Sequence, residues 1–65
     1  MEVKVNRKVI DIPMDMGLVE LLSMLGLSNW VTVIINEKSI LQGDYSQVSL
    51  KGNDDIIIIK PLGGG

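Results

Sequence analysis

The stretch Asp54-Asp55-Ile56-Ile57-Ile58-Ile59-Lys60 decides the fold of this 65-residue chain. Its four isoleucines follow a turn and predict a strand, in which successive side chains point to opposite faces of a sheet. Ile56 and Ile58 can then face a helix, whereas Ile57 and Ile59 face away from it. The stretch therefore predicts a sheet that carries apolar residues on both of its faces.

One segment of the chain has the apolar spacing of an amphipathic helix. Its stripe recurs at i, i+3, i+4 and i+7 and consists of Leu18, Leu21, Leu22 and Leu25. Asp15 precedes this stripe and is predicted to be the N-cap, and Gly26 follows it as a C-cap with left-handed backbone. A single short helix can cover only one face of a sheet.

Four other segments predict strands, because apolar residues recur in them with a period of two or in a short run. They span residues 2–6, 8–12, 30–35 and 39–41, and the first two are close enough to form a hairpin. The order is strand, strand, helix, strand, short strand, strand. It predicts a two-layer α+β roll in which a mixed sheet of four to five strands packs on one helix.

The face of the sheet that the helix leaves open is predicted to carry an apolar patch. Ile57 and Ile59 would form it together with Ile34 across the sheet and Leu62 beyond the strand. An exposed apolar patch usually marks a site where a partner protein docks. The alternatives are that Trp30 crosses over the patch or that two copies of the chain cover it.

Composition excludes several classes of function. The chain has no Cys and no His, which removes thiolate chemistry and the commonest general base and metal ligand. A formal net charge of −2 argues against nucleic-acid binding. The apolar runs are too short to span a membrane, and the N-terminus does not resemble a signal peptide. We therefore expect a cytoplasmic protein.

The eight carboxylates are scattered over turns and strand ends, so no catalytic residue and no metal site is predicted. Asp54-Asp55 is the one adjacent pair, and its position at the start of a strand explains it without catalysis. No Gly-rich phosphate-binding motif precedes the helix, and no activated nucleophile is evident.

The carboxylate of Gly65 is the group with unusual exposure. Pro61 ends the last strand, and Gly63, Gly64 and Gly65 have no side chains that would clash in a narrow channel. We expect a globular domain over residues 1–61 and a flexible tail over residues 62–65. Another enzyme could activate the carboxylate by adenylation; the alternative is a passive, disordered end or a linker.

The chain resembles the small ubiquitin-like sulfur carriers of the ThiS and MoaD family, and among them most closely the carriers of the thiamine pathway. The resemblance covers essentially the whole chain, and its matching stretches are Val3-Lys4-Val5-Asn6, Leu18-Val19-Glu20-Leu21-Leu22, Leu25-Gly26-Leu27, Val31-Thr32-Val33-Ile34-Ile35-Asn36, and residues 50–59 with the glycine end. The resemblance implies a β-grasp fold.

The resemblance also implies a cycle of activation and sulfur transfer. An E1-like adenylyltransferase of the ThiF or MoeB type would use ATP and magnesium to adenylate Gly65, and the carrier itself would bind no cofactor. A sulfur donor such as a cysteine desulfurase would then convert the adenylate to a thiocarboxylate. A thiazole synthase of the ThiG type would receive the sulfur. Gly64 is the penultimate glycine of the motif and Gly63 a spacer.

Two alternatives stay open at this point. The chain has Leu41, Gln42 and Tyr45 where the thiamine carriers often have Val-Pro-Arg and then Trp. A MoaD-like carrier for molybdopterin synthesis, or a carrier for another sulfur metabolite, is one alternative. The other is a β-grasp module that only binds proteins.

Overall fold

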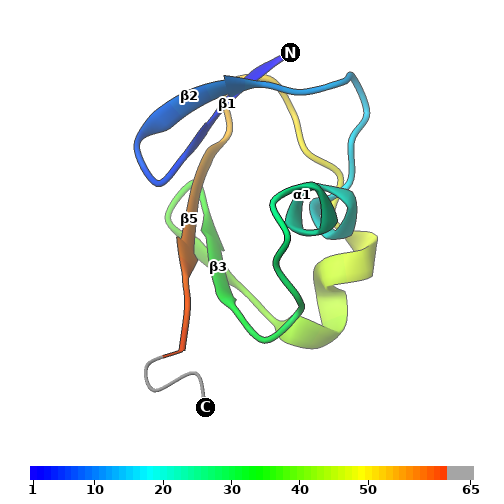
Figure 1. Cartoon of the computed structure of the whole chain (residues 1–65), viewed down its shortest axis with the longest axis vertical. Coiled ribbons are helices and arrows are strands. Elements are labelled where there is room, and N and C mark those ends of the chain that lie inside the picture. Colours follow the sequence, from blue (N-terminus) through cyan, green and yellow to red (C-terminus); the bar gives the residue numbers. More distant parts are fainter. Residues whose placement is uncertain (62–65) are drawn as a thin grey trace.

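A computed structural model describes residues 1–61 of the chain and shows a sheet with one helix packed against one face (Figure 1). The sheet contains β1 (Glu2–Val5), β2 (Lys8–Asp11), β3 (Thr32–Ile35), β4 (Lys38–Ile40) and β5 (Asp55–Ile59); the helix is α1 (Leu18–Met24), and η1 (Gln42–Gln47) is a 3₁₀ helix. The predicted tail, residues 62–65, lies outside the described residues.

The isoleucine strand β5 lies at the centre of the sheet. The strand order is β2-β1-β5-β3-β4, with β5 parallel to β1 and antiparallel to β3. The chain builds this order from two hairpins, β1–β2 and β3–β4, and β5 is inserted between them. The predicted α+β roll is confirmed, and its mixed sheet has five strands.

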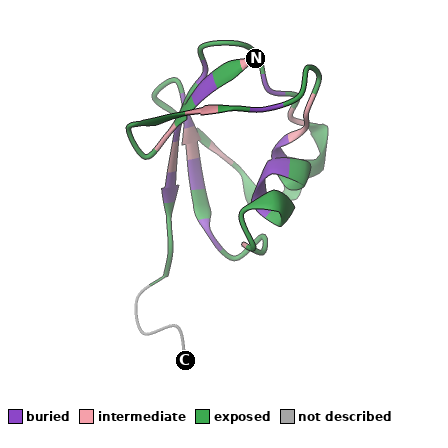
Figure 2. Cartoon of the chain, turned by 45° about the horizontal axis from the view of Figure 1, so that its top comes forward, coloured by how far each residue is buried: buried purple, intermediate pink, exposed green. Residues whose placement is uncertain are grey.

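The core lies between the sheet and α1. Ile56 and Ile58 of β5 are buried, as the alternation predicts, and Leu18, Leu21 and Leu22 of α1 are almost fully buried. Figure 2 shows the buried side of α1 turned toward the strands. Burial of each such side chain stabilises the fold by about 1.5–3 kcal/mol relative to its exposure.

The start of α1 differs from the prediction. The helix begins at Leu18, and its N-cap is Gly17 rather than Asp15, which lies in the preceding turn with a φ of 63°. The backbone N–H of Gly17 donates a hydrogen bond of 3.2 Å to Oε1 of Glu20. The carboxylate that accepts a hydrogen bond at the helix N-terminus is therefore that of Glu20, which follows the N-cap, and not that of Asp15, which precedes it.

The end of α1 agrees with the prediction at Gly26 but not at Leu25. Gly26 has a φ of 74°, its N–H donates to the carbonyl of Ser23, and the N–H of Leu27 donates to the carbonyl of Leu22. These two bonds form a Schellman motif, which requires left-handed backbone at the glycine. Leu25 is the C-cap residue and is 40% exposed, so the apolar stripe ends before it.

Both hairpins turn on an asparagine with left-handed backbone. Asn6 and Arg7 have φ values of 50° and 72°, and Asn36 and Glu37 have 50° and 71°. Positive φ at both central residues is the mark of a type I′ turn, and asparagine tolerates it better than most residues. The two turns thus match in backbone conformation and in first residue.

The side chains of these two asparagines hold β5 at both ends. Oδ1 of Asn6 accepts a hydrogen bond of 2.8 Å from the N–H of Ile58, and its Nδ2 donates to the carbonyl of Ile58 at 3.2 Å. Oδ1 of Asn36 accepts a bond of 3.0 Å from the N–H of Asp55. Each hairpin therefore contributes a side-chain bond that extends the backbone ladder of the central strand.

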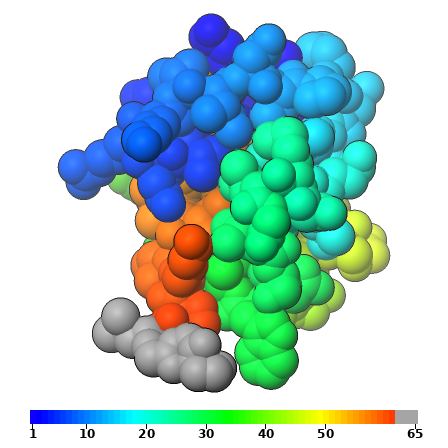
Figure 3. All heavy atoms as spheres, viewed as in Figure 1, coloured from blue at the N-terminus to red at the C-terminus, as the bar shows by residue number. Residues whose placement is uncertain are grey.

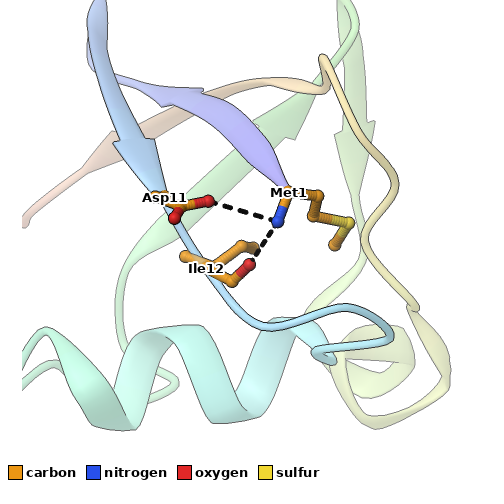
Figure 4. A network of polar contacts seen from close by, with 3 residues as sticks. All are labelled: Met1, Asp11 and Ile12. Atoms are coloured by element: carbon orange, nitrogen blue, oxygen red, sulfur yellow. Dashed lines mark hydrogen bonds and ion pairs between the residues drawn. The ribbon is translucent and has the colours of Figure 1, made fainter.

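The first residue is tied to the end of β2 (Figure 4). The amino group of Met1 donates a hydrogen bond of 2.6 Å to the carbonyl of Ile12, and the N–H of Ile12 donates to the carbonyl of Met1 at 2.8 Å. The amino group also lies 3.2 Å from Oδ1 of Asp11. Because Asp11 is 83% exposed, this ion pair contributes about 1 kcal/mol at most.

Candidate functional site

The predicted site lies where the chain leaves the centre of the sheet. β5 ends at Ile59, and the exposed residues Lys60 and Pro61 follow it. The predicted modified residue, Gly65, its neighbours Gly63 and Gly64, and Leu62 lie outside the described residues. Their roles therefore stay predictions, and the structure describes the base from which they extend.

The face away from α1 brings together three of the predicted docking residues. Ile34 lies opposite Ile57 in the β3–β5 pair, and Ile59 follows two residues later on the same face. Ile34 and Ile57 are half-buried, and Ile59 is half-exposed. We call Ile34, Ile57 and Ile59 the sheet patch; its role as a docking site is a prediction.

Two further apolar residues near the end of β5 are strongly exposed. Leu41, which the sequence reasoning did not place in the patch, is 74% exposed. Extending the β3–β4 register by one residue puts it beside Thr32, and Thr32 pairs with Ile59. Trp30 is 80% exposed, so its side chain buries little of its surface against the rest of the domain. The only sequence signal for Leu41 is an apolar residue that follows a short strand.

The Asp54-Asp55 pair has a structural role. Asp54 is buried, its Oδ2 accepts a hydrogen bond of 2.8 Å from the N–H of Lys51, and its Oδ1 accepts one of 2.9 Å from Nδ2 of Asn36. Asp55 is exposed. Within residues 1–61 no three metal-binding side chains lie close enough to hold an ion. Asp54 therefore fixes a turn, and the adjacent pair needs no catalytic explanation.

Replacing Asp54 with alanine is expected to lower the free energy of unfolding by about 2 kcal/mol, because two donors lose a buried acceptor. Denaturant melts monitored by circular dichroism measure the change. The neighbouring variant Asp55→Ala is the control and is expected to change stability by less than about 0.5 kcal/mol, since its side chain is exposed. Equal effects of the two substitutions would contradict the structural role of Asp54.

Within the described part of the chain, no helix has both the length and the apolar character needed to cross a membrane.

Comparisons with known proteins agree on one family. The ThiS family matches residues 1–65. The crystal structure of the thiamine biosynthesis protein ThiS from Geobacter metallireducens is similar with a TM-score of 0.86 and 26% identity, and the match covers 100% of both chains. An NMR structure of a thiamine biosynthesis protein from the same organism is similar with a TM-score of 0.81 and 28% identity, covering 100% of this chain and 88% of that one.

No curated protein sequence matches the chain. The family match nevertheless spans every residue, and the two solved structures reproduce the five-stranded sheet and its helix over the full length of this chain. The resemblance that the sequence suggests is therefore confirmed, together with the β-grasp fold that it implies. This chain belongs to the ThiS family, the small sulfur carrier proteins of thiamine biosynthesis.

Proposed function

We propose that this protein carries sulfur as a thiocarboxylate on Gly65. In the first step the Gly65 carboxylate attacks the α-phosphorus of ATP, and pyrophosphate leaves. In the second step sulfide attacks the acyl carbon of the adenylate, and AMP leaves with the electrons of the C–O bond. Where a persulfide supplies the sulfur, a thiol must also reduce the S–S bond that forms.

Family membership is the observation that carries this proposal. The place of the tail in the sequence supports it, because only Lys60 and Pro61 separate residues 62–65 from the central strand of the sheet. The described carboxylate pair supports it as well, since Asp54 is occupied by structural hydrogen bonds. In this proposal the reacting group is the carboxylate at the end of the chain, and other enzymes bind the folded domain.

Those other enzymes supply the catalysis, and ThiS family proteins work with partner enzymes in thiamine biosynthesis. The first partner in our proposal is an adenylyltransferase of the ThiF or MoeB type, which binds the ATP and magnesium. The second is a sulfur donor such as a cysteine desulfurase. The third is a thiazole synthase of the ThiG type, which accepts the sulfur. This chain needs no cofactor of its own in such a cycle.

Mass spectrometry of the intact protein tests the proposal. The protein is incubated with its adenylyltransferase, ATP, magnesium and sulfide, and a parallel sample lacks ATP. The expected result is a mass gain that corresponds to one oxygen replaced by one sulfur, only in the sample with ATP. An unchanged mass with an enzyme that is active on another carrier would instead support a module that only binds proteins.

Replacing Ile57 with aspartate is expected to weaken binding to the adenylyltransferase about tenfold or more, because a charge enters the middle of the sheet patch. Isothermal titration calorimetry measures the affinity, and circular dichroism verifies that the variant is folded.

Val9→Asp is the matched control for this substitution. Val9 is exposed and lies on the same face of the sheet as Ile57, but on β2, two strands away from β5. It is expected to leave the affinity within about twofold of the wild type. Equal affinities for the two variants would remove the sheet patch as the docking surface.

A further inference from the structure

An open groove lies beside the end of β5, on the side of the loop that follows α1. Its walls are Leu27, Trp30 and Val31 from that loop and Lys60 and Pro61 from the segment after β5, and its volume is about 490 Å³. Figure 3 shows this loop packed next to the end of β5, close to where the described chain stops. We call this groove the Trp30 groove; its volume is that of a ligand-sized pocket, so it has room for a side chain of a partner.

Trp30 makes little contribution to the fold. It is 80% exposed, whereas Tyr45, the other aromatic residue of the chain, is 2% exposed and donates a buried hydrogen bond to the carbonyl of Val31. A buried aromatic residue removes 150–250 Å² from water, and exposed tryptophans are among the commonest energetic anchors of protein interfaces. The loop is held in place beside it, because the Gln42 amide donates to the carbonyl of Asn29.

The charge of the groove selects the chemistry of its occupant. Lys60 is the one charged side chain among the described residues that line it. Arg7 in the β1–β2 turn and Lys8 at the start of β2 lie at the same end of β5, since the neighbouring Asn6 is bonded to Ile58. At the opposite end of the sheet lie three acidic residues, since Glu2 pairs with Asp11 and Asp55 begins β5. Lys60 thus gives the groove a positive charge in a chain of net charge −2.

We propose that the Trp30 groove receives an apolar side chain flanked by a carboxylate, presented by the adenylyltransferase that acts on the tail. The identity of this partner rests on the proposed function. The apolar side chain fills the space against Trp30, and the carboxylate pairs with Lys60. The groove lies on the helix side of the strand end and the sheet patch on the other, so the enzyme holds the base of the tail from both sides and fixes its direction.

The test uses the full chain and two pairs of matched variants. Trp30→Ala is compared with Met14→Ala, since Met14 is similarly exposed at 72% but is not in the groove. Lys60→Glu is compared with Lys51→Glu, an equal change of charge at an exposed residue near the start of β5. Affinity for the adenylyltransferase is measured at low and at physiological salt, and charging is measured by mass spectrometry.

We expect Trp30→Ala to weaken binding about thirtyfold and Lys60→Glu about tenfold, with the Lys60 effect larger at low salt. The control variants are expected to stay within about twofold of the wild type. Trp30 is the only tryptophan of the chain, so its fluorescence is expected to shift to shorter wavelength when the wild type binds the enzyme. The two losses of affinity and the fluorescence shift all depend on Trp30 or Lys60, which line the groove.

The outcomes separate this inference from the proposed function. If the wild type is charged while Trp30→Ala and Lys60→Glu behave like their controls, the groove inference is overturned and the function stands. If the groove variants weaken binding but no thiocarboxylate forms, the groove inference stands and the function does not. No binding by the wild type overturns both. A Trp30 shift that depends only on the concentration of the carrier assigns the groove to a second copy and overturns the inference.

Discussion

Replacing Gly64 with valine is expected to abolish thiocarboxylate formation while leaving the free energy of unfolding unchanged. We expect the end of the chain to enter a narrow channel of the adenylyltransferase, where a residue without a Cβ fits and a side chain clashes. A β-branched side chain next to the reacting glycine would stop entry at the last step. Intact-mass measurements over time give the charging rate, and denaturant melts give the stability.

Two variants of the same tail serve as controls. Gly63→Val places the same side chain one residue farther from the reacting carboxylate, and we expect it to charge more slowly than wild type but measurably. Deleting one glycine gives the same chain whichever of the three is removed, and this chain still ends in two glycines. The deletion therefore tests reach alone, since it shortens the tail by about 3.3 Å. Full charging of Gly64→Val would contradict the expectation that the tail must pass through a narrow channel.

Much of the fold could be predicted because alternation in a strand and spacing in a helix are local properties. The isoleucine run assigned Ile56 and Ile58 to the core and Ile57 and Ile59 to the other face, and the structure has this arrangement. Gly26 was predicted as the left-handed end of the helix from its position alone, and its φ is 74°. These features depend on neighbours within a few residues.

The features that the sequence did not predict correctly are those whose structure depends on contacts between distant segments of the chain. Asp15 has the right type for an N-cap, but the chain turns at that residue and the helix starts later at Leu18. Leu25 keeps the spacing of the stripe, yet it is the C-cap of the helix and its side chain is 40% exposed. The exposure of Trp30 also depends on where its loop lies against the end of β5. Periodicity carries no information about such placements.

The hydrogen bonds of Asn6 and Asn36 to β5 are the clearest omission. In the sequence both residues resemble ordinary turn asparagines. Asn6 and Ile58 are 52 residues apart, so their bond depends on the parallel register of β1 and β5. In a parallel ladder the backbone carbonyl of Asn6 would accept from the N–H of Ile58. Because Asn6 turns away with a φ of 50°, its side-chain oxygen takes that place.

The second large effect is accordingly expected at Asn6. Asn6→Ala should lower the free energy of unfolding by about 3 kcal/mol. About 1 kcal/mol comes from each of the two bonds to Ile58, and about 1 kcal/mol from left-handed backbone, which alanine tolerates less well than asparagine. For a domain of this size the midpoint of thermal unfolding should fall by at least about 12 °C. Calorimetry and denaturant melts measure both quantities.

Asn6→Gly separates the two contributions, because glycine accepts the positive φ but has no amide to bond with Ile58. It should cost about 2 kcal/mol, less than alanine at the same position. Hydrogen exchange gives a local readout: the N–H of Ile58 should lose protection in Asn6→Gly, whereas the N–H of Asn36, bonded to the carbonyl of Asp55 at the other end of β5, should keep it. Equal stability of the glycine variant and the wild type would mean that the Asn6 side chain does not hold β5. Ile58 precedes Pro61 by three residues. Loss of its protection would therefore indicate that the base from which the tail extends opens more often.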